Sequence, residues 1–167
     1  MEHIFQDENG TWKLEEYLKY LQSIRDRLPA NAKLFAFLDG HYDISHQRCP
    51  HDSWVEFVSV REHSEGVRKQ IRTLDIIAKF LNSYHDGFFE ITYKNVKKYS
   101  LKLDRVHRKL FEGDTEDGPK IGHGDWIIDE ILLDDFGNVI HEIEFSDSGL
   151  WKIVCEDIIY DWVSQPN

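Results

Sequence analysis

Residues 126–145 read WIIDEILLDDFGNVIHEIEF, and residues 150–159 read LWKIVCEDII. Three segments in this part of the chain are rich in Ile, Leu and Val, and each predicts a β-strand. The segments are residues 126–133, 139–145 and 150–159. The connections between them are so short that neighbouring strands must be antiparallel. The end of the chain therefore predicts a three-strand antiparallel meander.

The preceding residues predict two amphipathic helices and further strands. Residues 11–28 and 64–84 carry apolar side chains at helical spacing, and Pro29 ends the first helix. Strands are expected over residues 33–38, 54–60 and 88–93, and residues 94–111 fit either a strand to about residue 103 or a helix. The sequence thus predicts one α+β domain over residues 1–167. Its antiparallel sheet ends in the meander, and two amphipathic helices pack on one face of that sheet.

Composition indicates a globular chain with no membrane-spanning segment. The 167 residues are 41% hydrophobic and 13% aromatic, and the longest apolar run covers only residues 34–38. The first residues lack the basic and apolar regions of a signal peptide. Cys49 and Cys155 are the two cysteines, and both are expected to be reduced thiols. These features predict a cytoplasmic protein.

Charge is distributed very unevenly along the chain. Residues 112–167 contain fifteen acidic and two basic side chains, whereas the whole chain has a formal net charge of −11. The acids alternate with large apolar residues, so this segment is not typical of a disordered acidic tail. A folded acidic surface repels nucleic acid and attracts a basic partner or cations. The charge pattern therefore favours binding over catalysis.

The predicted meander carries a carboxylate face. A turn centred on Phe136 places Glu142 opposite Asp129 or Glu130, and Glu144 shares the face of Glu142. Like charges opposed across a ladder destabilise it, so this face is expected to meet something positive; the alternative is a solvated face that keeps the sheet soluble. Aromatic residues on its rim would supply anchors. The expected partner-binding residues are Asp129, Glu130, Glu142, Glu144, Trp151, Glu156, Asp157 and Tyr160.

The loop over residues 39–52 is rich in His, Cys and Asp. Imidazole, thiolate and carboxylate groups are ligands for zinc and iron, so His41, His46, Cys49 and His51 form a candidate site for zinc or another divalent metal. Their spacing matches no standard motif, and the alternative is a polar surface loop. Apart from this metal, no cofactor is expected.

Basic residues gather between Lys94 and Lys109. Taken alone, this stretch suggests contact with nucleic acid. The acidic strands that follow it, and the pI near 5.2, favour neutralisation inside one sheet instead. We therefore expect no direct nucleic-acid binding. The sequence does not indicate an oligomeric state.

In size, acidity, helices and acidic meander, the chain resembles the immunity proteins of bacterial toxin–immunity systems. That resemblance implies a small cytosolic, non-enzymatic protein that neutralises a basic partner such as a toxin. One alternative is a metal-binding or hydrolytic enzyme that uses the loop over residues 39–52. Another is a duplex mimic whose carboxylates occupy nucleic-acid-binding proteins.

Overall fold

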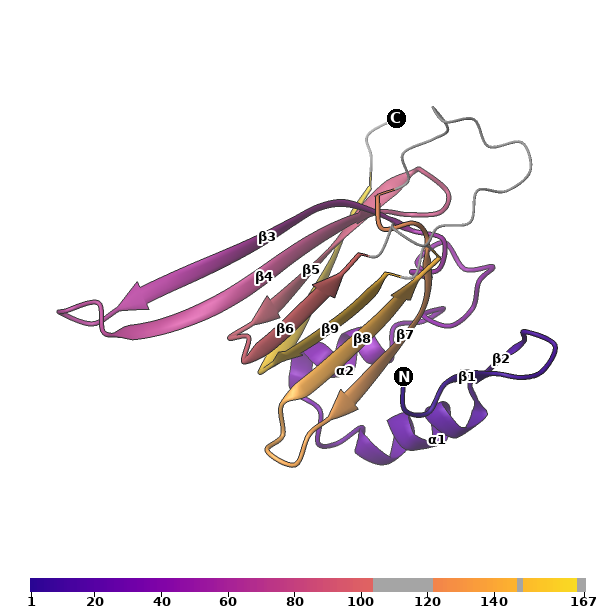
Figure 1. The fold of residues 1–167 in the computed structure, drawn as a ribbon, viewed down its shortest axis with the longest axis horizontal. Helices are drawn as coiled ribbons and strands as arrows, with labels where there is room; N and C mark the ends of the chain where they lie inside the picture. Colours follow the sequence, from indigo (N-terminus) through magenta and orange to yellow (C-terminus); the bar gives the residue numbers. More distant parts are fainter. Residues whose placement is uncertain (104–121, 147–148, 165–167) are drawn as a thin grey trace.

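The computed structural model describes residues 1–103, 122–146 and 149–164, and Figure 1 shows their arrangement. The described residues are mostly β, with 48% in strands and 12% in helices, so the α+β prediction is wrong. Within the described residues there are two helices, α1 (Glu15–Ile24) and α2 (Ala30–Ala36). The strands are β1 (Phe5–Gln6), β2 (Trp12–Lys13), β3 (Trp54–Glu65), β4 (Ile71–Leu81), β5 (Gly87–Lys94), β6 (Lys98–Lys102), β7 (Trp126–Leu133), β8 (Val139–Phe145), β9 (Leu150–Cys155) and β10 (Asp157–Ser164).

Two four-stranded antiparallel sheets form the body of the molecule. The first sheet has the order β10-β5-β4-β3, and the second has the order β6-β9-β8-β7, while β1 and β2 pair by themselves. The chain passes between the two sheets twice, from β5 to β6 and from β9 to β10. A bridge between Trp54 and Asp125 joins the sheets again next to β3 and β7. The two inner faces therefore lie against each other.

The core consists of alternate residues from these inner faces together with the buried residues of α1 and α2. Phe80 of β4 stacks on Phe89 of β5 with ring centroids 5.0 Å apart, and Trp126 of β7 meets Phe80 edge-on. Trp151 of β9 is also fully buried and lies beside Phe145. Large aromatic side chains bury the most apolar area per residue, so this cluster is the main source of hydrophobic stabilisation.

The helices cover sheet edges, not one sheet face. On α1, the hydroxyl groups of Tyr17 and Tyr20 accept hydrogen bonds from the backbone N–H groups of Ile131 (2.8 Å) and Leu133 (3.1 Å) on the edge strand β7. On α2, the ring of Phe35 stacks on Tyr160 of β10, the edge strand of the first sheet. Each helix thus satisfies or shields an edge that would otherwise pair with another chain.

The predicted helix over residues 64–84 is instead a hairpin. Gly66 (φ +85°) and Lys69 (φ +56°) make the turn between β3 and β4. Ile76, Ala78 and Phe80 then alternate into the core, which is strand periodicity. The apolar residues of this segment also fit the spacing of a helix. The turn at Gly66 and the pairing of β4 with β3 and β5 decided between helix and strand. In Figure 1 the far end of this hairpin extends beyond the remaining strands.

The remaining elements agree with the sequence to different degrees. The predicted strand over residues 33–38 falls mainly on α2, whose N-cap is Pro29. The first helix, α1, ends at Ile24, before the predicted end at residue 28. The third segment of the predicted meander divides at Glu156 into β9 and β10, which belong to different sheets. Residues 98–102 form strand β6, as one alternative predicted, and residues 104–111 lie outside the described part.

Candidate functional site

The predicted carboxylate pair exists, but other residues of the same chain already bind both carboxylates. Glu130 and Glu142 are directly opposed in the β7–β8 register. Glu130 is fully buried and accepts hydrogen bonds from the backbone N–H groups of Glu2 (2.7 Å), His3 (2.7 Å) and Ile4. Three donors on one carboxylate satisfy its charge without any partner molecule. The N-terminal segment therefore lies against this part of the second sheet, and Figure 1 shows it beside β7.

Glu142 is likewise engaged. Its carboxylate pairs with the ammonium group of Lys152 on β9 and lies 3.5 Å from the backbone nitrogen of Met1. Burial alone would raise its pKa, but these positive groups outweigh burial and hold the pKa below its ordinary value. Glu142 is therefore ionised and neutralised locally, and the like-charge opposition is relieved inside the fold.

Asp129 lies on the inner face, opposite Ile143, and not on the carboxylate face. Both of its oxygens lie 3.1 Å from Nε2 of His41, and Oδ2 lies 3.3 Å from Nε2 of His141 and 3.4 Å from the hydroxyl of Tyr42. Burial would raise the pKa of Asp129, but the two histidines outweigh it and hold the pKa well below its usual range. Asp129 is thus a buried carboxylate at the centre of a polar network.

Every ring nitrogen of the two histidines has a polar partner in this network. Nδ1 of His41 lies 3.0 Å from the carbonyl oxygen of Phe35, and a carbonyl only accepts, so Nδ1 donates. Nε2 of His41 faces both oxygens of Asp129. His141 faces Asp129 through Nε2 and the hydroxyl of Tyr93 through Nδ1 (2.9 Å). The buried carboxylate is therefore surrounded by hydrogen-bonding groups, as buried polar groups require.

The four predicted metal ligands have separate roles in the structure. His41 belongs to the Asp129 network, and Cys49 is buried with Sγ 3.1 Å from the carbonyl oxygen of His41. Burial raises the pKa of Cys49 to about 11, so the thiol is protonated. His46 accepts the backbone N–H of Arg48, and His51 pairs with Asp52 at 3.0 Å. Within the described ranges, no group of three or more His, Cys, Asp and Glu side chains is arranged to hold a metal ion.

Most of the other predicted partner-binding residues are also buried or bound to residues of the same chain. Glu156 pairs with Lys97 (2.7 Å), and Asp157 accepts hydrogen bonds from α2. Trp151 is fully buried, which corrects its prediction as a rim anchor, because strand alternation turns it into the core. Tyr160 faces inward and stacks on α2, while Glu144 is half-buried on the outer face of β8.

The outer face of the first sheet was missed by the sequence prediction. Its side chains alternate with the buried residues of β4 and β5, so they point away from the core. Three large apolar side chains on it are strongly exposed: Trp54 (46%), Phe57 (43%) and Val163 (55%). The outer face consists of Trp54, Phe57, Ser59, Ile77, Lys79, Leu81, Phe88, Glu90, Thr92, Ile159, Asp161 and Val163.

Plain alternation would separate the two exposed aromatic residues on β3. A β-bulge between Val55 and Phe57 inserts one extra residue, so Trp54 and Phe57 pair with Leu81 and Lys79 and share the outer face. Bulges re-aim side chains, and nothing in the local sequence marks this one. The aromatic content of residues 54–57 was the available signal.

A second carboxylate pair lies on this outer face. Glu90 of β5 and Asp161 of β10 are directly opposed. Neither carboxylate has a hydrogen bond or ion pair within the described part of the chain. On its other side Glu90 is directly opposite Lys79 of β4, whose ammonium group lies over the ring of Phe88 at 3.9 Å. The like charges of Glu90 and Asp161 destabilise the ladder, and the charge of Lys79 offsets this only at Glu90.

Comparisons with known proteins give no indication of function, so the function is argued from the geometry of the structure. No protein-family model, curated protein or solved structure matches this chain. Among the described residues, no helix has the length and apolar character needed to cross a membrane.

Proposed function

We propose that this chain is a non-enzymatic binding protein whose outer face of the first sheet docks a basic protein. The observation that carries the proposal is the combination of Trp54, Phe57 and Val163, all strongly exposed, with the opposed carboxylates of Glu90 and Asp161. Exposed apolar clusters rimmed by polar groups are typical of protein-interaction sites. No described helix packs across this face.

The aromatic residues supply the expected anchors. Tryptophan is enriched among the interface residues whose truncation costs the most binding free energy. The indole of Trp54 is held by His85, with ring centroids 4.6 Å apart in an edge-on arrangement. A pre-positioned ring loses little conformational freedom on binding, so more of its contact energy remains as affinity.

Charge favours a basic partner. The chain has a net charge of −11, and the two unpaired carboxylates lie within the outer face. A complementary field raises association rates to about 10⁸–10⁹ M⁻¹s⁻¹ at low salt. This suits a protein that neutralises a toxin, as the resemblance to immunity proteins implies, and that role is part of the proposal.

Capture from a lysate of the source cells tests the proposal. The tagged protein would be loaded with lysate and eluted with rising salt, and the eluted proteins identified by mass spectrometry. The double variant Trp54→Ala/Phe57→Ala removes the anchors. The matched control, Leu18→Ala/Leu34→Ala, removes two exposed leucines from the helices.

We expect one basic protein at stoichiometric amounts with the wild type and the control, and its loss with the double variant. Thermal unfolding would verify that all three chains are folded. Equal capture by the double variant would contradict the assignment of this face. Absence of any stoichiometric partner would contradict the binding function.

A further inference from the structure

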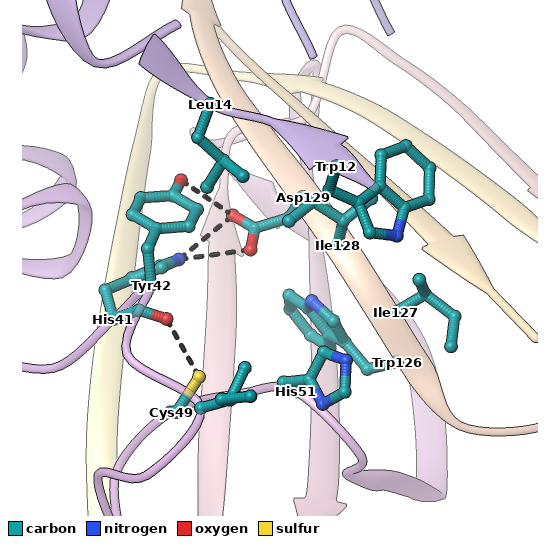
Figure 2. Close-up of a pocket in the computed structure, with 11 residues that line it drawn as sticks. Trp12, Leu14, His41, Tyr42, Cys49, His51, Trp126, Ile127, Ile128 and Asp129 are labelled. Carbon is teal, nitrogen blue, oxygen red and sulfur yellow. Dashed lines mark hydrogen bonds and ion pairs between the residues drawn. The ribbon is translucent and has the colours of Figure 1, made fainter. Parts of the chain in front are cut away.

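A cavity of about 210 Å³ lies between the N-terminal hairpin, the loop over residues 39–52 and the start of β7. Figure 2 shows the side chains of its wall. The pocket opens to the surface beside the exposed Ile44, and for comparison an apolar cavity of about 150 Å³ takes up benzene. This cavity therefore has room for an organic molecule of one or two rings. Its apolar lining consists of Trp12, Leu14, Ile44, Trp126, Ile127 and Ile128.

The charged groups in the wall are already neutralised. Asp129 is held by His41 and Tyr42, and these contacts appear as dashed lines in Figure 2. The remaining nitrogen of His41 is bound to the Phe35 carbonyl oxygen. A charged ligand would meet no counter-charge here and would lose its hydration. The wall therefore selects an uncharged molecule.

His51 adds one directional polar group. Its Nδ1 lies 3.0 Å from Oδ2 of Asp52, and an ionised carboxylate only accepts, so Nδ1 carries the proton. In the neutral ring this leaves the lone pair of Nε2 to accept a hydrogen bond. The ring of His51 lines the same cavity as Trp126. A ligand with one O–H or N–H group would find its acceptor there.

We infer that this cavity binds an uncharged aromatic molecule of one or two rings with a single O–H or N–H group, such as a phenol or an indole. The rings of Trp12 and Trp126 provide aromatic contact, and Nε2 of His51 accepts the single polar hydrogen. Apolar walls with few, well-placed polar groups are typical of small-molecule sites. The site is separate from the outer face and does not depend on its function.

Isothermal titration calorimetry of the full chain with phenol and indole tests the inference. Toluene lacks the donor, and benzoate carries a charge, so these two probes test the chemistry of the wall. Ile44→Trp replaces an aliphatic side chain with a bulky indole at a cavity-lining position that is 72% exposed, and Leu34→Trp on α2, also 72% exposed, is the matched control. His51→Phe removes the acceptor and keeps a ring.

We expect saturable 1:1 binding of phenol or indole, at least tenfold weaker binding of toluene, and none of benzoate. Ile44→Trp should weaken phenol binding at least tenfold and Leu34→Trp should leave it unchanged. His51→Phe should reduce the affinity for phenol to that for toluene. Three results would each overturn the inference: no saturable binding of phenol or indole at millimolar concentration, unchanged binding by Ile44→Trp, or equally tight binding of benzoate.

Discussion

The molecule contains two opposed carboxylate pairs with contrasting surroundings. Glu130 and Glu142, on the second sheet, receive backbone N–H groups of the N-terminal segment and the ammonium group of Lys152. Glu90 and Asp161, on the first sheet, have no hydrogen bond or ion pair among the described residues. The same local repulsion is thus relieved by close donors in one place, whereas in the other it meets only the cross-strand charge of Lys79, with no ion pair formed.

This difference separates structural acids from acids that are free to act on a partner. A buried carboxylate with several donors orders the segment that supplies them. An exposed, unpaired carboxylate beside apolar rings slightly destabilises the sheet, and that cost is offset only when a positive partner arrives. Acidity alone therefore does not locate a binding surface; the state of each carboxylate does.

The largest effect is expected for Glu130→Ala. Removing this carboxylate leaves three N–H donors without their acceptor, and we expect the free energy of unfolding to fall by about 3 kcal/mol. Urea unfolding followed by tryptophan fluorescence measures it. Glu144→Ala on the adjacent strand is the control, with an expected change within about 0.5 kcal/mol. Equal effects of the two variants would contradict the structural role of the Glu130 carboxylate.

The next effect concerns association with the captured partner. Glu90→Lys/Asp161→Lys reverses the open pair, and we expect the association rate at low salt to fall at least tenfold. The difference from wild type should shrink as salt screens the field. Stopped-flow measurements at several salt concentrations give both quantities. Glu8→Lys/Glu15→Lys, which makes the same charge change on exposed residues near the N-terminus, should have a smaller effect.

A third effect is on the free energy of unfolding at acidic pH. The folded pKa of Glu142 is below its ordinary value of 4.5, so its contribution is present above that pH and is lost as pH falls through the folded pKa. Below about pH 4.5 we expect the unfolding free energy of Glu142→Gln to decline less steeply than that of the wild type. Chemical unfolding at a series of pH values measures this slope. Parallel curves would show that Glu142 is not neutralised as described.

The smallest effect is a gain in stability. Asp161→Asn removes the repulsion with Glu90 and leaves Lys79 opposite Glu90, and we expect the free energy of unfolding to rise by about 0.2–1 kcal/mol. Glu56→Gln, at the bulge and outside any direct carboxylate pair, should change stability less. Loss of stability in Asp161→Asn would indicate that this carboxylate has a stabilising partner.

Local patterns predicted some elements well. The segments over residues 126–133 and 139–145 match β7 and β8, and the short turn fixed their register closely enough to oppose Glu142 and Glu130. The helix predicted over residues 64–84 was wrong because the apolar spacing there fits both periods, and the pairing of β4 with its neighbours β3 and β5 decided between them. Fold class was wrong for that reason.

The candidate sites depended on information that the local sequence lacks. The donors to Glu130 come from more than 120 residues away in the chain, so its neutralisation could not be inferred from the strand that carries it. The bulge near Glu56 moved Phe57 to the face of Trp54. His41 was recognised as a chemically capable side chain, but its partner, Asp129, belongs to a distant strand.

Oxidative footprinting of the purified complex tests the contrast between the two sheets most directly. Hydroxyl radicals modify exposed side chains of both sheets in one sample, and mass spectrometry quantifies each site. We predict that Trp54 and Phe57 lose most of their reactivity when the partner binds, while Leu150, exposed on the outer face of the second sheet, keeps its reactivity. Protection of Leu150 with unchanged reactivity of Trp54 and Phe57 would contradict the account.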